Sequence, residues 1–210
     1  MVKLTIDGIQ VEAEKGTSIL HAAESVGIEV PTLCYIKDLL PDGSCRMCMV
    51  EIESRGRTKM ETACTAQVAE GLVVTTNSEK VRNARRNILD MLLSNHKTDC
   101  FSCPSNGDCK LQELCFEYGI ERTTYSGEQT ELPIDDSNKF FTYNPNLCIL
   151  CHRCVNTCHK IVGRGAIDTM ERGFDSAIGT PFHIDWADTN CESCGNCVQA
   201  CPTGALTMKR

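Results

Sequence analysis

Apolar and polar residues alternate over the first dozen positions of the chain. Lys3-Leu4-Thr5-Ile6 and Ile9-Gln10-Val11-Glu12 flank the pair Asp7-Gly8. A two-residue turn of this kind tolerates positive φ angles and joins two antiparallel strands. The pattern therefore predicts a β-hairpin over residues 3–12.

A helix is expected next, because apolar residues recur at intervals of three and four. Thr17 or Ser18 can cap the first turn of this helix, and Gly27 suits the position just after its last turn. The apolar face is formed by Ile19, Ala22, Ala23 and Val26.

A further strand and a longer helix follow. Residues 72–75 form a short β-branched run that predicts a strand. Residues 79–95 predict a helix that leads to His96, with an apolar face of Val81, Ala84, Ile88, Met91 and Leu92. Residues 121–138 are polar without periodicity, which indicates a connector. This mixture of strands and helices predicts an α+β fold.

Sixteen of the 210 residues are cysteine, a density that requires either disulfides or metal-bound thiolates. The first ten residues contain no apolar segment and no cleavage site typical of a secretory signal. We therefore expect a cytoplasmic protein with reduced, metal-binding thiols. No apolar run approaches the roughly 18 to 20 residues that span a bilayer, so no membrane span is expected.

Charge and composition restrict the expected partners and the expected domain architecture. The chain has 28 acidic and 21 basic side chains and a formal charge of −7, which disfavours nucleic acid as a partner. Apolar residues make up 41% of the chain and aromatic residues only 5%. We therefore expect several small domains held by metal rather than one large core.

The C-terminal part of the chain contains one cysteine pattern twice. The spacing C-x2-C-x2-C-x3-C occurs at Cys148, Cys151, Cys154 and Cys158, and again, followed by Pro202, at Cys191, Cys194, Cys197 and Cys201. In bacterial ferredoxins the fourth cysteine of such a run binds the neighbouring 4Fe-4S cluster. This crossed logic assigns one cluster to Cys148, Cys151, Cys154 and Cys201, and another to Cys158, Cys191, Cys194 and Cys197. Two zinc sites are the alternative.

Two histidines accompany the first run. His152 stands where ferredoxins commonly have glycine, and His159 stands where they usually have proline. Either side chain can tune a cluster by a hydrogen bond to its sulfur. The alternative for both is a partly exposed histidine beside a ligand.

An earlier group of four cysteines has a different spacing, C-x10-C-x2-C-x15-C, at Cys34, Cys45, Cys48 and Cys64. Four thiolates can hold a 2Fe-2S cluster. The loop over residues 41–48 is rich in turn-forming residues, which let backbone amides point at sulfide. Zinc is the alternative ligand of this group.

A fourth group combines one histidine with three cysteines, spaced H-x3-C-x2-C-x5-C, at His96, Cys100, Cys103 and Cys109. We predict a 4Fe-4S cluster here. A neutral imidazole makes the cluster less anionic than four thiolates would, which raises its potential. The alternative for His96 is a charged capping residue at the end of the preceding helix.

Several conspicuous residues remain outside these groups. Cys115 is expected to be a small buried hydrophobic residue, and His21 and His183 are expected to be structural. The segment Gly163-Arg164-Gly165 lacks the strand and helix that surround a nucleotide-binding loop. Because no nucleotide or acid-base motif is found, we expect no catalytic residue and no substrate-turnover site in this chain.

Five segments together resemble a known family. They are PTLCY at 31–35, GSCRMCMV at 43–50, ACT at 63–65, His96 to Cys109, and CVQACPTGAL at 197–206. In this order they resemble the N-terminal iron-sulfur region of the complex I large subunit, of iron-only hydrogenases and of NAD-linked formate dehydrogenases. The chain looks most like the small diaphorase subunit of multi-subunit NAD(P)-linked hydrogenases.

The resemblance implies a β-grasp 2Fe-2S ferredoxin-like domain over residues 1–78, a small helical His-Cys 4Fe-4S domain with a connector over 79–138, and a bacterial two-4Fe-4S ferredoxin domain over 139–210. One 2Fe-2S and three 4Fe-4S clusters would then relay electrons. The implied partners are a flavin- and NAD(P)H-binding subunit and a catalytic subunit on another polypeptide, a hydrogenase first and a formate dehydrogenase next. Electron bifurcation is left open.

Two other classes of function stay open from the sequence. A freely diffusing polyferredoxin-type shuttle is compatible with the acidic charge. A zinc-binding interaction module is compatible with isolated C-x2-C pairs.

Overall fold

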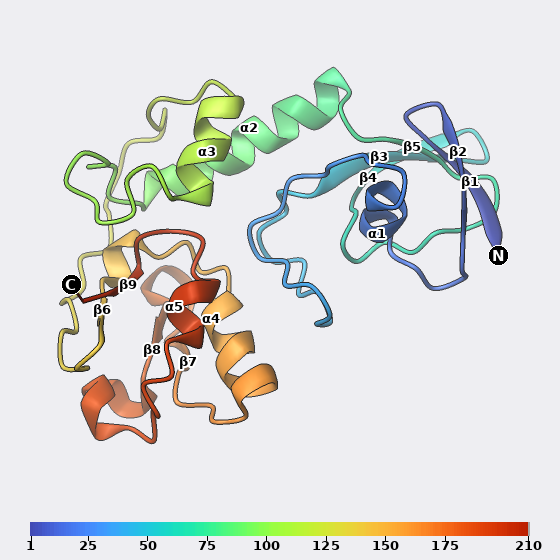
Figure 1. Cartoon of the computed structure of the whole chain (residues 1–210). Coiled ribbons are helices and arrows are strands. Elements are labelled where there is room, and N and C mark those ends of the chain that lie inside the picture. The colour runs from blue at the N-terminus through green and yellow to red at the C-terminus, as the bar shows by residue number, and fades with distance from the viewer. Residues whose placement is uncertain (210) are drawn as a thin grey trace. The chain divides into compact units, whose positions relative to one another are not determined.

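The computed structural model describes residues 1–209. The chain divides into two compact units, Met1–Leu89 and Asp90–Arg210, and each is described by itself below. Both units mix strands and helices (Figure 1). The α+β prediction is confirmed.

The N-terminal hairpin forms as predicted. Strands β1 (Val2–Ile6) and β2 (Ile9–Ala13) pair antiparallel. Asp7 and Gly8 join them with φ angles of 45° and 84°, the positive values that a two-residue hairpin turn requires. The structure confirms this hairpin and its turn.

The first helix, α1 (Ile19–Glu24), begins at Ser18, whose hydroxyl oxygen accepts a hydrogen bond from the His21 backbone N–H at 3.2 Å. Gly27 follows the helix with a φ of 76°. Its buried face packs on the sheet and joins a core with Ile6 and Val50 (Figure 1). The predicted helix and its cap are confirmed.

A five-stranded sheet in the order β2-β1-β5-β3-β4 forms the rest of the unit. Strand β5 (Val73–Thr75) pairs parallel with β1 and confirms the strand predicted there. Strands β3 (Met49–Ser54) and β4 (Arg57–Thr62) form a second hairpin that the sequence reading did not predict. Arg55 and Gly56 make its turn with positive φ angles.

Helix α2 (Glu79–Ser94) confirms the longer predicted helix and part of its apolar face, since Val81 is buried and Ala84, Ile88 and Leu92 are half-buried. The buried residues recur every four positions, at Val81, Arg85, Leu89 and Leu93, whereas Met91 is 54% exposed. The predicted face was wrong at Met91 and missed Arg85, which interrupts the apolar pattern of the buried side. Its guanidinium group is buried and donates a hydrogen bond to the Met49 carbonyl oxygen at 2.8 Å.

The second unit holds short elements between long loops. Its strands pair β6 (Phe141–Tyr143) with β9 (Leu206–Met208) and β7 (Asp168–Met170) with β8 (Ala177–Gly179), both antiparallel. Its helices are α3 (Lys110–Glu117), α4 (Arg153–Asn156), a π-helical continuation of α4 (Thr157–Val162) and α5 (Asn196–Ala200). Short 3-10 turns lie at Pro145–Leu147, Gly173–Asp175, Pro181–His183 and Trp186–Asp188.

Trp186 is the centre of the core of this unit. It is 3% exposed and packs edge-on against Phe141, with ring centroids 5.0 Å apart. The Tyr143 ring packs on the same indole, and its hydroxyl donates a hydrogen bond to the Ile178 carbonyl oxygen. Strands β6 and β8 are therefore tied to one aromatic cluster beside the cysteine runs.

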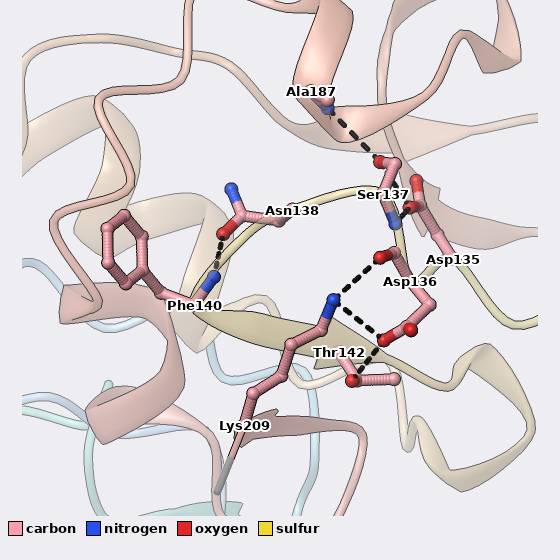
Figure 2. A network of polar contacts seen from close by, with 8 residues as sticks. All are labelled: Asp135, Asp136, Ser137, Asn138, Phe140, Thr142, Ala187 and Lys209. Atoms are coloured by element: carbon pink, nitrogen blue, oxygen red, sulfur yellow. Dashed lines mark hydrogen bonds and ion pairs between the residues drawn. The ribbon is translucent and has the colours of Figure 1, made fainter.

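The end of the predicted connector, residues 135–138, is held by the polar network in Figure 2. One Asp135 carboxylate oxygen accepts a hydrogen bond from the Ser137 backbone N–H at 2.9 Å, and the other accepts one from the Trp186 N–H at 3.0 Å. The Asp136 carboxylate forms an ion pair with Lys209 at 3.0 Å. The connector is free of helix, as predicted, but this part of it is built into the second unit.

No helix within residues 1–209 is both long enough and apolar enough to cross a membrane.

Candidate metal centres

The four cysteines of the first group are all buried in the N-terminal unit, at the side of the sheet where β3 begins and β4 ends. They lie as two pairs. The Cys48 and Cys64 sulfurs are 3.3 Å apart, and a hydrogen bond with Cys45 lowers the pKa of Cys34. Two thiolates for each of two irons is the arrangement that a 2Fe-2S cluster requires.

The loop that carries Cys45 and Cys48 is shaped by positive φ angles. Arg46 adopts a φ of 60°, and the next backbone N–H, of Met47, donates to the Cys45 sulfur at 3.5 Å. Gly43 has a φ of 66°, and an added Cβ atom would come within 3.0 Å of the Thr65 methyl group. Backbone donors therefore face sulfur here, as expected for a site that holds negative charge.

His96 follows the end of α2 and faces the second group. The side chain is only 7% exposed, and burial lowers its pKa. A neutral imidazole is the form that binds metal, whereas the charged helix cap considered above needs the protonated form. The Nδ1 atom is buried and has no hydrogen-bond partner among the described residues. The burial and the unpartnered nitrogen fit a metal ligand.

A cavity of about 770 Å³ lies beside His96. Cys100 and Cys109 line it together with His96, so the structure brings these three predicted ligands together. Cys103 does not line the cavity, and an added Cβ atom at Gly204 would come within 2.7 Å of its sulfur. Cys103 still lies near the group, because burial raises the pKa of Cys109 and the charges of Cys103 and Cys100 add to this effect. Cys115 lines the cavity instead and is buried as predicted.

The two C-terminal cysteine runs repeat each other in conformation as well as spacing. Leu150 and Ser193, at equivalent positions, have φ angles of 51° and 57°. Their backbone N–H groups donate to the Cys148 and Cys191 sulfurs, each at 3.4 Å. The same left-handed turn therefore supplies a backbone donor to sulfur in both runs.

The fourth cysteine of each run lies with the other run. Burial raises the pKa of Cys151 to about 12, and the neighbouring charges that add to this effect are those of Cys148 and Cys201. Reciprocally, Cys158, the fourth cysteine of the first run, shares one small cavity with Cys191, Cys194 and Cys197 of the second run. Helices α4 and α5 lie side by side and carry the two runs (Figure 1). The thiols are therefore grouped in the crossed manner.

His152 occupies a left-handed position with a φ of 59°, and its equivalent in the second run is Gly195 with a φ of 74°. A side chain in this region costs on the order of 1 kcal/mol that glycine avoids. We expect His152→Gly to raise the free energy of unfolding by about 1 kcal/mol, measured by anaerobic denaturant unfolding of the metallated protein. The matched variant Gly195→His should lower it by a similar amount; equal midpoints for both variants would contradict this reason.

Asn138 positions the loop of the second run. It is 4% exposed, its amide donates to the Ser193 hydroxyl oxygen at 2.9 Å, and its carbonyl oxygen accepts from the Phe140 N–H at 2.9 Å. The sequence reading missed this residue because it lies in the polar connector, and no local signal marked it.

We expect Asn138→Ala to destabilise the protein by about 1 to 3 kcal/mol, because it leaves buried groups unpaired. The centre that includes Cys191 and Cys194 should also bleach faster in air than the other centres, measured by the loss of its electron paramagnetic resonance (EPR) signal. Thr142→Ala, which removes an exposed hydrogen bond to Asp136, is the control and should do neither. Equal bleaching in both variants would show that Asn138 does not hold this loop.

The remaining histidines bond to protein groups. His159 Nε2 lies 2.8 Å from the Ile167 carbonyl oxygen, which leaves that nitrogen engaged with backbone rather than sulfur. His21 Nε2 lies 2.5 Å from the Tyr35 hydroxyl, and His183 Nε2 lies 2.9 Å from a Glu171 carboxylate oxygen. These contacts give all three histidines a structural role.

Within residues 1–209, no three His, Cys, Asp or Glu side chains meet closely enough to hold one metal ion. In an iron-sulfur cluster each protein ligand binds a different iron or shares an iron with only one other, so the ligands stand farther apart. The soft thiolate donors that the structure groups here fit such clusters chemically.

Three family models match the chain in succession. They are the 2Fe-2S iron-sulfur cluster binding domain over residues 1–79, the NADH-ubiquinone oxidoreductase-G iron-sulfur binding region over 85–124, and the ferredoxin-like domain of NADH-quinone oxidoreductase subunit 3 over 139–207. Binding domains for both 2Fe-2S and 4Fe-4S clusters are therefore present.

A solved structure matches the whole fold. A chain in the crystal structure of an NAD+-reducing NiFe-hydrogenase in the H2-reduced state superposes with a TM-score of 0.90 at 30% sequence identity, over 99% of this chain and 87% of that one. The chain belongs to the iron-sulfur family shared by NAD(P)-linked hydrogenases and complex I. The family resemblance inferred from the five segments is confirmed.

Curated members of this family are more similar in sequence but much longer. The NADPH-Fe(3+) oxidoreductase subunit alpha of Geobacter sulfurreducens is 44% identical over 100% of this chain and 24% of its own length. The NADP-reducing hydrogenase subunit HndD of Solidesulfovibrio fructosivorans is 38% identical over 98% of this chain and 36% of its own length. The chain thus spans about a quarter to a third of these relatives, which are subunits of NAD(P)-linked oxidoreductases.

Proposed function

We propose that this chain is an electron-transfer subunit that carries one 2Fe-2S and three 4Fe-4S clusters. It would accept electrons from a flavin- and NAD(P)H-binding subunit and pass them to a separate catalytic subunit, a hydrogenase first and a formate dehydrogenase next. When bound, the clusters supply one-electron redox chemistry, and the protein supplies thiolates, one imidazole and N–H donors that set their charge. Whether such a complex bifurcates electrons is a further hypothesis.

The observation that carries this proposal is the grouping of the thiols. Two pairs lie in the N-terminal unit, three predicted ligands line the His96 cavity, and Cys158 shares a cavity with three cysteines of the other run. This grouping supports the ligand sets predicted from spacing. The three successive family matches support the domain boundaries 1–78, 79–138 and 139–210.

The relatives support the proposed partners. One relative is named as a subunit of an NADP-reducing hydrogenase, and the structural match comes from an NAD+-reducing hydrogenase. Both names couple a nicotinamide to hydrogen, which requires a path for electrons between two reaction sites. All sixteen cysteines are free in the structure, as metal binding in a reducing cytoplasmic compartment requires.

Anaerobic purification followed by metal analysis tests the proposal. We expect iron and sulfide in the amounts of one 2Fe-2S and three 4Fe-4S clusters, and EPR signals from both cluster types after reduction. Zinc in place of iron, with no such signals, would contradict the electron-transfer function. It would favour the interaction module instead.

A second measurement separates a subunit from a freely diffusing shuttle. We expect the tagged protein, isolated anaerobically from its own cells, to elute in a large complex together with a flavoprotein that oxidises NAD(P)H. If the whole population elutes as a monomer with its full cluster content, the protein is not a bound subunit, and the result favours the freely diffusing shuttle.

A further inference from the structure

The cavity beside His96 holds four metal donors, and only three of them belong to the predicted ligand set. The fourth is Cys115, which lines the same cavity as His96, Cys100 and Cys109. The predicted fourth ligand, Cys103, does not line this cavity. Its sulfur lies against Gly204, and its charge acts on Cys109 from outside the lining residues. The structure therefore offers the cavity a complete set of three thiols and one imidazole without Cys103.

Cys115 is held in this place by the helix that carries it. Helix α3 begins directly after Cys109, so one short rigid segment carries both thiols toward the cavity. Leu111 and Leu114 of the same helix are each at most 2% exposed and fix its buried face. Cys115 is 8% exposed and lines the cavity. Burial raises its pKa and the charges of Cys109 and Cys100 add to this effect, so the three thiols lie near one another.

An independent observation shows that this cavity is built for a bound group. The His96 side chain is 93% buried and lines the cavity, while its buried Nδ1 atom lacks a hydrogen-bond partner among the described residues. Leaving a buried polar atom unpaired is unfavourable for the folded state. A ligand that orders the imidazole offsets this cost, and the thiols on the same walls are donors that iron-sulfur clusters accept.

We propose that Cys115 is a reserve ligand of the His-Cys 4Fe-4S centre, able to complete the set of His96, Cys100 and Cys109 in place of Cys103. In the exchange, the Cys115 thiol loses its proton as its sulfur binds iron, and the released Cys103 thiolate takes up a proton. The centre keeps three thiolates and one imidazole, so its charge is unchanged. The inference rests on the proposed function, because it requires a 4Fe-4S centre at these residues.

Three variants of the full chain test this role: Cys103→Ala, Cys115→Ala and the double variant, each purified anaerobically. Iron and sulfide per chain and the EPR spectrum after reduction are measured for each. We expect both single variants to retain the iron and sulfide of this centre, with a changed spectrum for Cys103→Ala. The double variant should lose this one centre, while the signals of the other centres, which report correct folding, stay unchanged.

Two results would overturn the proposed role of Cys115. Loss of the centre in Cys103→Ala to the same extent as in the double variant, with all other signals intact, overturns the reserve role and leaves the proposed function standing. Wild-type protein that shows no 4Fe-4S signal beyond those of the two C-terminal runs overturns both.

Discussion

Replacing Cys201 by serine is expected to remove the centre formed with Cys148, Cys151 and Cys154, and to spare the centre of its own run. The reason is the crossed grouping, in which the Cys201 charge acts on the pKa of thiols in the first run. Serine binds iron much more weakly than a thiolate, so one 4Fe-4S signal should fall at least several-fold. EPR spectra of the reduced variant, with iron and sulfide analysis, measure the loss.

The matched control is Cys158→Ser, which tests the reciprocal case, the fourth cysteine of the first run. Because Cys158 shares a cavity with the cysteines of the second run, this variant should remove the other signal and preserve the first. Two results would show that the ligand sets are not crossed. In one, both variants lose the same signal; in the other, each variant loses the signal of the centre built from its own run.

His96→Cys is expected to keep a 4Fe-4S centre and to lower its potential by on the order of 100 mV, because a thiolate adds one negative charge where a neutral imidazole stood. The magnitude follows from centres in which two histidines replace two cysteines, whose potentials lie a few hundred millivolts higher. Burial of His96 strengthens the effect, since charge is poorly screened away from water. An EPR-monitored redox titration measures the shift.

The control for this prediction is His183→Ala. His183 lies in the same unit but is bonded to Glu171 at the surface, with 60% of its side chain exposed, and its removal should leave every potential unchanged. A titration of His96→Cys that superposes on the wild-type curve would mean that His96 is not a ligand.

Local spacing was sufficient to predict which thiols the structure groups together in most of the candidate ligand sets. Ligands two or three residues apart must lie within one turn of chain, so the runs starting at Cys148 and Cys191 could be recognised without a structure. The crossed grouping was also predictable, because the second copy of the spacing supplies the partner run that a crossed arrangement needs. The hairpin at Asp7-Gly8 and the helix capped by Ser18 were predictable because their signals are also local.

The predictions that were missed or wrong depend on contacts between distant residues. Arg85 is buried because a carbonyl group of β3 accepts its hydrogen bond, and this partner is invisible in the sequence of the helix. Asn138 matters because it contacts Ser193, 55 positions away. The hairpin of β3 and β4 was missed although Arg55-Gly56 marks its turn, because the sequence of β4, RTKMET, is largely polar and lacks the apolar alternation of a strand.

Cys115 shows a third kind of limit. Counting ligands by spacing left this thiol over, and its burial was predicted correctly. Its position on the wall of the His96 cavity depends on how α3 packs, and five residues separate it from Cys109. Spacing alone could not distinguish a filler of the core from a donor at a metal site.

The pairing of β6 with β9 has a consequence for biosynthesis. Residues 141–143 bond to residues 206–208, so this small sheet cannot close on the ribosome until both ends of its segment have emerged. The N-terminal unit, in contrast, is complete once residue 89 has been released. The first unit can therefore fold on nascent chains whose last small sheet is still open.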